Sequence, residues 1–167
     1  MQVRTLEDAD VEAALDLFAA VAGEGQWLAT EAPLDRREVR ARWKDLLDTG
    51  EGTLLVAKDA GALVGLAAMV GRPEPELGML VRSDRRRRGV GAALVEACVA
   101  WARERRARCV VLHVFPHNAA AIALYEKHGF VARGFVRRGY LRRNGERWDA
   151  VRMVRELQPT EPGAGPG

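Results

Sequence analysis

The spacing of apolar residues predicts four helices. Apolar side chains recur at helical spacing through Val11, Leu15 and Phe18, and the same period returns in the long segment after Gly89. The highly charged segment at residues 35–47 carries one apolar face, which also indicates a helix. The short segment at residues 119–128 is followed by Gly129, and glycine commonly terminates helices. The predicted helices cover residues 11–22, 35–47, 89–106 and 119–128.

The remaining apolar runs predict strands. The sequences Asp-Ala-Gly at residues 59–61 and Asn-Gly at residues 144–145 lie between such runs and favour hairpins. Residues 109–115 form an almost continuous apolar run, which is typical of a strand buried on both faces. The order predicts a mixed α/β (α+β) fold with several antiparallel hairpins and one strand–helix–strand unit at residues 76–115. The predicted strands cover residues 2–5, 53–58, 62–70, 76–82 and 109–115, with two more within residues 131–157.

Length and composition favour a single globular domain. The chain has 167 residues, of which 48% are hydrophobic and 29% charged, and this size supports one hydrophobic core. We expect the domain to span residues 1–157, followed by a flexible tail rich in proline and glycine over residues 158–167. No apolar run approaches the roughly 18 residues that a membrane span requires. The charged N-terminus lacks the apolar region of a secretory signal, so the expected compartment is the cytoplasm.

The two cysteines indicate no redox or metal chemistry. Cys98 lies in a helical apolar pattern, and Cys109 opens an apolar strand. Neither has a zinc-type spacing to other cysteines or histidines. We therefore expect two buried structural thiols, with no disulfide and no metal site.

Positive charge is concentrated in one part of the chain. The formal net charge is +3, yet nine arginines fall within residues 82–108. Such a block attracts a polyanion, either nucleic acid or a phosphorylated cofactor, or else forms a solvated face. Residues 82–100 contain no aromatic side chain that could stack on bases, which disfavours nucleic acid.

A turn between a predicted strand and a predicted helix carries the pattern Arg86-x-x-Gly89-x-Gly91. A helix N-terminus has unpaired N–H groups and the positive end of the helix dipole, and glycines let these donors approach an anion closely. The turn therefore predicts a phosphate site, with a plain tight turn as the alternative. It is not a P-loop, because no Gly-Lys-Ser/Thr follows, and it lacks the third glycine of a dinucleotide fingerprint.

A second stretch makes the pattern more specific. Residues 111–130 place a strand before Asn118, then a helix with Leu-Tyr at residues 124–125 and a closing Gly-Phe at residues 129–130. Together with the preceding glycine turn, this stretch resembles the two signatures of the GNAT superfamily of N-acetyltransferases. The resemblance extends over residues 2–157. It implies the acyl-CoA N-acyltransferase fold, a mostly antiparallel mixed sheet with splayed central strands between helices.

The resemblance implies acetyl-CoA as the cosubstrate, without a metal. Backbone groups of the strand before the turn would pair with the pantetheine arm as an added strand and polarise the thioester carbonyl. Backbone amides of the turn would hold the pyrophosphate, and Asn118 would bind the arm near the thioester, besides or instead of capping its helix. Arg87 and Ser83 stand where the family commonly has glycine and proline, so the local turn geometry stays open. The residues implied for acetyl-CoA are Met79, Leu80, Val81, Arg86, Arg87, Arg88, Gly89, Val90, Gly91, Ala92, Asn118 and Tyr125.

Two residues are candidates for proton transfer. The resemblance places Tyr125 near the cofactor sulfur, where its phenol could protonate the departing thiolate. The alternative is a tyrosine that only packs in the core. Glu76 opens the strand leading to the cofactor, where family members often keep a carboxylate that serves as the base; the alternative is an exposed strand-end glutamate. His113 points away from the side of its apolar neighbours and is interpreted as structural.

The implied function is transfer of the acetyl group of acetyl-CoA to a primary amine of a small molecule, such as an amino acid, by direct attack on the thioester. Acetylation of a protein or peptide amine and a non-catalytic acyl-CoA sensor are the alternatives. The acceptor side would lie at residues 24–31 and 135–148, with Trp27 and Glu31 as candidate contacts, or else as loop packing. By analogy, the family also suggests a homodimer, with no membrane partner and no nucleic acid.

Overall fold

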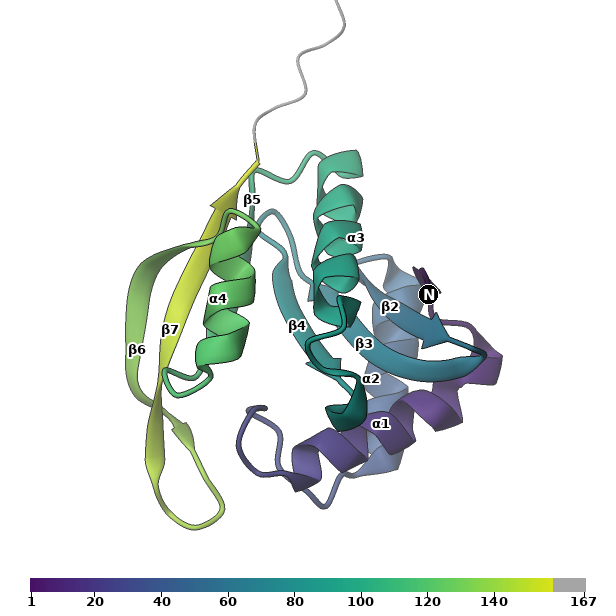
Figure 1. Cartoon of the computed structure of the whole chain (residues 1–167), viewed down its shortest axis with the longest axis horizontal. Coiled ribbons are helices and arrows are strands. Elements are labelled where there is room, and N and C mark those ends of the chain that lie inside the picture. Colours follow the sequence, from purple (N-terminus) through teal and green to yellow (C-terminus); the bar gives the residue numbers. More distant parts are fainter. Residues whose placement is uncertain (158–167) are drawn as a thin grey trace, which may run out of the picture.

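The computed structural model describes residues 1–157, which form one seven-stranded sheet with helices on both faces (Figure 1). The strand order is β1-β2-β3-β4-β5-β7-β6. The tail predicted at residues 158–167 lies outside the described residues. The strands are β1 (Gln2–Thr5), β2 (Gly52–Asp59), β3 (Ala62–Val70), β4 (Glu76–Val81), β5 (Cys109–Val114), β6 (Val131–Leu141) and β7 (Arg147–Glu156). The helices are α1 (Val11–Gly23), α2 (Arg36–Thr49), α3 (Val90–Glu104) and α4 (Ala119–Lys127).

The sheet divides between β4 and β5. The other neighbouring strands pair antiparallel over several residues, whereas β4 and β5 run parallel and share the single registered pair Glu76 and Val111. Beyond this pair the half of the sheet ending in β4 parts from the β5–β7 half (Figure 1). The facing edges of β4 and β5 therefore keep backbone groups without a strand partner. This geometry confirms the mostly antiparallel mixed sheet with splayed central strands.

Side chains of β4 alternate between two cores. Leu77 and Met79 pack toward α3 on one face of the sheet. Leu80 packs toward α1 and α2 on the other face, and Glu76 and Gly78 share that side because alternate residues of a strand point the same way. The alternation therefore fixes the face on which each β4 side chain can act.

Local capping explains where the helices begin and end. Asp35 accepts the backbone N–H of Glu38 at 3.0 Å and caps the start of α2, which ends at Thr49 because Gly50 follows with a φ of 68°. The predicted third helix, residues 89–106, is shorter in the structure and ends at Glu104, because Arg106 takes a positive φ of 56°. The other predicted elements agree with the structure to within a few residues. Among residues 1–157, none of the helices has the length and apolar character that a membrane span needs.

Candidate active site

A cleft of about 780 Å³ opens where β4 and β5 separate. Because it passes between unpaired strand edges, side chains from both faces of the sheet reach it. The loop between α1 and α2, the turn before α3 and the start of α4 complete its walls. Most of the predicted site residues line it: Trp27, Glu76, Met79, Leu80, Val81, Arg86, Arg87, Gly89, Gly91, Ala92, Asn118 and Tyr125.

Three predicted site residues lie outside this lining. Val90 is 4% exposed because its side chain enters the core below α3. Arg88 is exposed on the turn. Glu31 accepts the backbone N–H of Arg143 at 2.8 Å and lies 3.6 Å from the guanidinium of Arg142. The Glu31 carboxylate thus holds the α1–α2 loop to the β6–β7 turn.

Backbone conformation shapes the turn before α3. Arg87 and Gly89 take positive φ values of 60° and 81°, and α3 starts at the next residue. The first N–H groups of a helix have no carbonyl one turn earlier to bind. A Cβ at Gly91 would lie 2.9 Å from Cδ2 of Leu124, so glycine is needed where α4 approaches α3 closely. The helix mouth beside the cleft is therefore suited to an anionic group.

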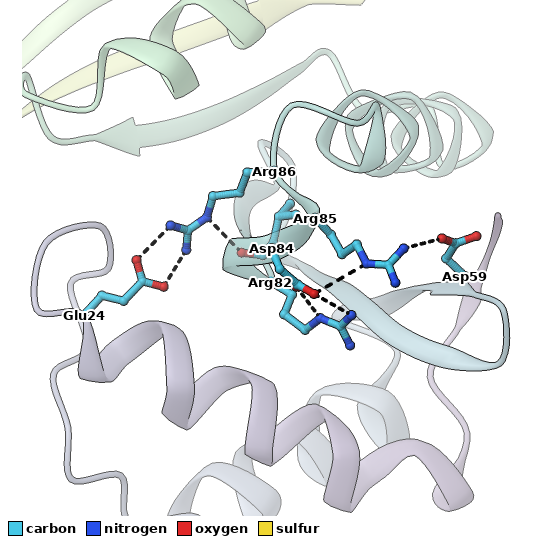
Figure 2. A network of polar contacts seen from close by, with 7 residues as sticks. Glu24, Asp59, Arg82, Asp84, Arg85 and Arg86 are labelled. Atoms are coloured by element: carbon cyan, nitrogen blue, oxygen red, sulfur yellow. Dashed lines mark hydrogen bonds and ion pairs between the residues drawn. The ribbon is translucent and has the colours of Figure 1, made fainter.

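Carboxylates engage the arginines that precede the turn (Figure 2). Arg82 Nε lies 2.6 Å from Asp84 Oδ1. Arg85 Nη1 lies 2.8 Å from Asp59 Oδ2, which ties the turn to the end of β2. Much of the positive charge of this segment is therefore neutralised locally, which the sequence alone did not indicate.

Arg86 links the turn to the α1–α2 loop (Figure 2). Its guanidinium donates to both carboxylate oxygens of Glu24, at 2.6 and 2.8 Å, and its Nε donates to the carbonyl of Val81 at 3.1 Å. Trp27 Nε1 also donates to Glu24, at 2.6 Å. Hydrogen bonds from Arg86 and then Trp27 hold the pKa of Glu24 below its ordinary value. The side chain of Arg86 is thus a structural link, and its backbone remains available to the cleft.

Tyr125 lies on the α3–α4 side of the cleft. It is 7% exposed, and its ring packs 5.7 Å from that of Phe130. Burial raises its pKa well above the ordinary value for tyrosine, so the phenol keeps its proton at neutral pH. Within residues 1–157 no hydrogen bond to this hydroxyl is found, although the residue lines the cleft. A protonated donor facing a substrate cleft can serve as a general acid.

Glu76 and His113 lie on the opposite face. Glu76 Oε1 is 2.8 Å from His113 Nδ1, and both residues line the cleft. Tyr140 lines the same wall, and burial, with the charge of Glu76, raises its pKa. A carboxylate paired with an imidazole is a common arrangement for accepting a proton. The sequence indicated the correct face for His113 but not its contact with Glu76, because that contact depends on the parallel register of β4 and β5.

Asn118 caps α4 and also lines the cleft. Its Oδ1 accepts the backbone N–H of Ala121 at 3.2 Å, which confirms the predicted N-cap. The side-chain amide of an asparagine carries two further N–H donors. The cap therefore leaves Asn118 able to donate to a ligand.

Arg142, at the β6–β7 turn, lies beside the cleft-lining residue Phe115. Its guanidinium carbon lies 5.4 and 4.2 Å from the ring centroids of Phe115 and Trp148, in cation–π contact with two rings that meet edge to face. Nη1 donates to the carbonyls of Leu28 and Ala29, at 2.9 and 3.1 Å. This arginine, which is 3% exposed, fastens the α1–α2 loop to the β6–β7 turn. The guanidinium of Arg142 is thus used to hold the loop.

Comparisons with known proteins agree with this geometry. Residues 20–130 match the model of the Acetyltransferase (GNAT) family. The Bacillus subtilis protein named "Putative phosphinothricin acetyltransferase YwnH" is 27% identical over 165 residues, which cover 94% of this chain and 99% of that protein. The structure of ribosomal-protein-alanine N-acetyltransferase from Brucella melitensis has a TM-score of 0.85 at 26% identity, covering 94% of this chain and 100% of the other. A phosphinothricin acetyltransferase from Sinorhizobium meliloti, solved in complex with acetyl-CoA, has a TM-score of 0.84 at 22% identity, covering 96% and 94%.

The matched region includes the parts that build the cleft. It contains β4, the glycine turn, α3 and α4, with Asn118 and Tyr125 among its residues. It runs over more than half of the chain. The protein therefore belongs to the acetyltransferase (GNAT) family.

Proposed function

We propose that this acetyltransferase moves the acetyl group of acetyl-CoA to the primary amine of a small molecule. The observation that carries the proposal is the cleft between β4 and β5, with a protonated phenol on one face of the sheet and a carboxylate–imidazole pair on the other. Direct transfer needs a base for the amine and an acid for the leaving thiolate. Because they lie on opposite faces of the sheet, the Glu76–His113 pair can act on the amine while Tyr125 acts on the leaving thiolate.

Acetyl-CoA fits the α3 side of the cleft and supplies the activated thioester. Backbone N–H groups over residues 89–92 would hold the pyrophosphate, and the free edge of β4 at residues 79–81 would pair with the pantetheine arm. Val90 would contribute its backbone alone, because its side chain lies in the core. Arg87 and Arg88 are exposed on the turn, and no ion pair to either is found within residues 1–157, so their charges are available to phosphate groups.

The proposed reaction is a single displacement. Glu76, oriented by His113, accepts the proton that the amine loses, either directly or through water. The amine nitrogen forms a bond to the carbonyl carbon, and backbone N–H groups near Leu80 and Val81 stabilise the charge that develops on the carbonyl oxygen. As the carbon–sulfur bond breaks, Tyr125 gives its proton to the sulfur. Solvent then returns a proton to the phenol and removes one from the base, which balances the cycle.

The acceptor side favours a small molecule over a polypeptide. Trp27 and Tyr140 line the cleft there, and Arg142 holds the loop at residues 24–31 against the hairpin. His117 Nε2, 2.7 Å from the carbonyl of Gln26, adds a second link between the loop and the other half of the sheet. An extended peptide needs an open groove or a strand edge. Two of the similar proteins above are named for phosphinothricin and one for a ribosomal-protein alanine.

Calorimetry and a turnover assay test this proposal. Titration with acetyl-CoA should show binding, and release of the CoA thiol should depend on an added small amine. The panel would include phosphinothricin, free amino acids, alkylamines and a peptide with an N-terminal alanine. Preferred turnover of the peptide would favour a protein acceptor, and binding without turnover on any amine would favour a sensor. Absence of acetyl-CoA binding would overturn the proposal.

We place the reaction in the cytoplasm, because acetyl-CoA is a cytoplasmic metabolite. The homodimer suggested by family analogy stays a prediction, which sedimentation would test.

A further inference from the structure

We propose that an apolar cavity next to the cleft binds the hydrocarbon part of the acceptor, so that the preferred amine carries an alkyl or aryl group. The inference rests on the proposed function, because it extends the acceptor side of the same site. It names a second binding region and the chemical class that this region takes.

The cavity has a volume of about 610 Å³ and lies between the α1–α2 layer and the sheet. The rings of Phe18 and Trp43 form part of its wall, stacked with centroids 6.2 Å apart and planes 15° from parallel. Buried leucines from the sheet, among them Leu66 and Leu80, line the other side. Charged lining residues such as Glu51 are exposed. The interior therefore suits an uncharged, apolar group.

Gly78 connects this cavity to the cleft. It lines both, and it faces the same side of β4 as Glu76, two residues earlier. A Cβ at Gly78 would have no other atom within 4 Å, so the space above the strand is open at this point. The residue registered with Gly78 on the neighbouring strand β3 is Ala68, whose side chain is also small. Leu28 and Ala29, the residues held by Arg142, line both spaces as well.

The cavity lies on the face of the sheet where the amine, and not acetyl-CoA, is proposed to bind. Tyr125 and Met79 lie on the α3 side, where acetyl-CoA would bind. The cavity lies on the α1–α2 side, together with Glu76 and His113. An amine with its nitrogen at Glu76 finds the cavity about 7 Å further along the same face of β4, two residues at the rise of a strand. A long acyl chain would have to turn through the plane of the sheet to reach it.

A homologous series of straight-chain primary amines, from ethylamine to octylamine, tests the proposal. These amines have nearly the same basicity, so differences in kcat/KM report binding of the alkyl chain. Ethylamine is too short to reach Gly78, whereas octylamine extends beyond it. Once the chain passes Gly78, kcat/KM should rise roughly fourfold per methylene, the factor expected for burial of one methylene group.

Gly78→Val should remove this rise by filling the junction. The readout is the ratio of kcat/KM for octylamine to kcat/KM for ethylamine, which should fall in this variant from the parent's value toward unity. Gly78→Ala should give an intermediate loss. Gly23→Ala is the matched control, because Gly23 also has open space at its Cβ position but lines neither the cleft nor the cavity. It should leave the whole series unchanged.

Several results would overturn the inference while leaving the proposed function intact. One is a parent enzyme whose kcat/KM does not depend on amine chain length. Another is an equal loss for ethylamine and octylamine in Gly78→Val. A third is a Gly78→Val variant that changes the preference among acyl-CoA chain lengths and leaves the amine series unaffected. If no amine is turned over, calorimetry of octylamine binding in the presence of CoA decides, and binding lost in Gly78→Val supports the cavity independently of catalysis.

Discussion

Glu76 Oε1 and His113 Nδ1 lie 2.8 Å apart where β4 and β5 begin to diverge. Glu76 is registered with Val111, and His113 is two residues further along β5, so the pair exists because the two strands are parallel and in this register. A one-residue slip would send His113 to the opposite face. The proposed base is therefore built by the same contact that joins the two halves of the sheet.

Replacement of Glu76 by Gln should lower kcat/KM about 100-fold, since it removes the carboxylate that accepts the proton. His113→Gln should cause a smaller loss, and the double variant should be no worse than Glu76→Gln, because groups that act as a unit are not additive. The measurement is the pH dependence of kcat/KM for one small amine. Parent-like activity of Glu76→Gln over the whole pH range would remove Glu76 from the mechanism.

Tyr125→Phe should lower kcat by about 10- to 100-fold while acetyl-CoA affinity stays within a factor of two, since the hydroxyl acts on the leaving thiolate. Because burial raises the pKa of Tyr125, the parent should show no loss of its acid through moderately alkaline pH. Tyr140→Phe removes the other tyrosine hydroxyl that lines the cleft and should have a smaller effect. Equal losses in the two variants would argue against the acid role.

Gly89→Ala should weaken acetyl-CoA binding about tenfold, because a left-handed φ costs a non-glycine residue about 1–2 kcal/mol and the turn would relax. Gly145→Ala introduces the same strain at the β6–β7 turn, where φ is 86°. Both variants should lose similar stability in urea, and only Gly89→Ala should lose affinity by calorimetry. Similar affinity losses would mean that the turn before α3 has no special part in binding.

Arg142→Lys should raise KM for the amine and leave acetyl-CoA affinity unchanged, because a lysine cannot present a planar guanidinium to the two aromatic rings or donate through a planar fork. Loss of the bonds to the carbonyls of Leu28 and Ala29 should also lower the free energy of unfolding by about 2 kcal/mol. Arg137→Lys is the control, since Arg137 is exposed on β6. An unchanged KM in Arg142→Lys would contradict the clamp.

Asp10 should make the stability depend on pH in the acid range. This carboxylate is 3% exposed and pairs with Arg4 at 2.6 Å and Lys58 at 3.0 Å. The hydrogen bond from Arg4 contributes most to holding its pKa well below the ordinary value of 3.8. A lowered folded-state pKa stabilises the protein fully above the unfolded-state value, and this contribution is lost as pH falls through the folded-state value.

Asp10→Asn should therefore be about 2 kcal/mol less stable than the parent at pH 7, with a difference that shrinks below about pH 4. Urea unfolding at pH 7 and pH 3 measures the change. Asp16→Asn, which breaks an exposed pair with Arg36, should stay within about 0.5 kcal/mol of the parent. A constant difference between Asp10→Asn and the parent at both pH values would exclude the charge of Asp10 as the cause.

Local sequence signals were enough to predict the helices and strands and the order along the chain of the segments that line the cleft. The turn chemistry at Asn144 and Gly145 and the glycine before α3 are read from a few neighbouring residues, and the structure has both where they were predicted. The parallel strand–helix–strand unit also follows from local pattern, because β4 and β5 are joined through a helix.

Contacts between distant segments could not be predicted in the same way. Glu24 and Arg86 are 62 residues apart, and Arg142 binds carbonyls more than 110 residues earlier. No local periodicity carries such pairings, since they depend on how the loops are brought together by the packed sheet. For the same reason the sequence left open whether Glu31 contacts the amine or packs the loop, and in the structure its carboxylate accepts a hydrogen bond from the hairpin backbone.

Because the sheet is divided between β4 and β5, a ligand bound there would complete its hydrogen bonding. An extended pantetheine arm between β4 and β5 would satisfy amides that otherwise exchange readily with solvent, so hydrogen exchange over residues 79–81 would slow when it binds. Binding to the folded state alone also raises the melting temperature, by an amount that grows with the logarithm of the free ligand concentration. The resistance of this protein to unfolding would then follow the supply of the metabolite it consumes, and nutrient status would influence how long each copy lasts.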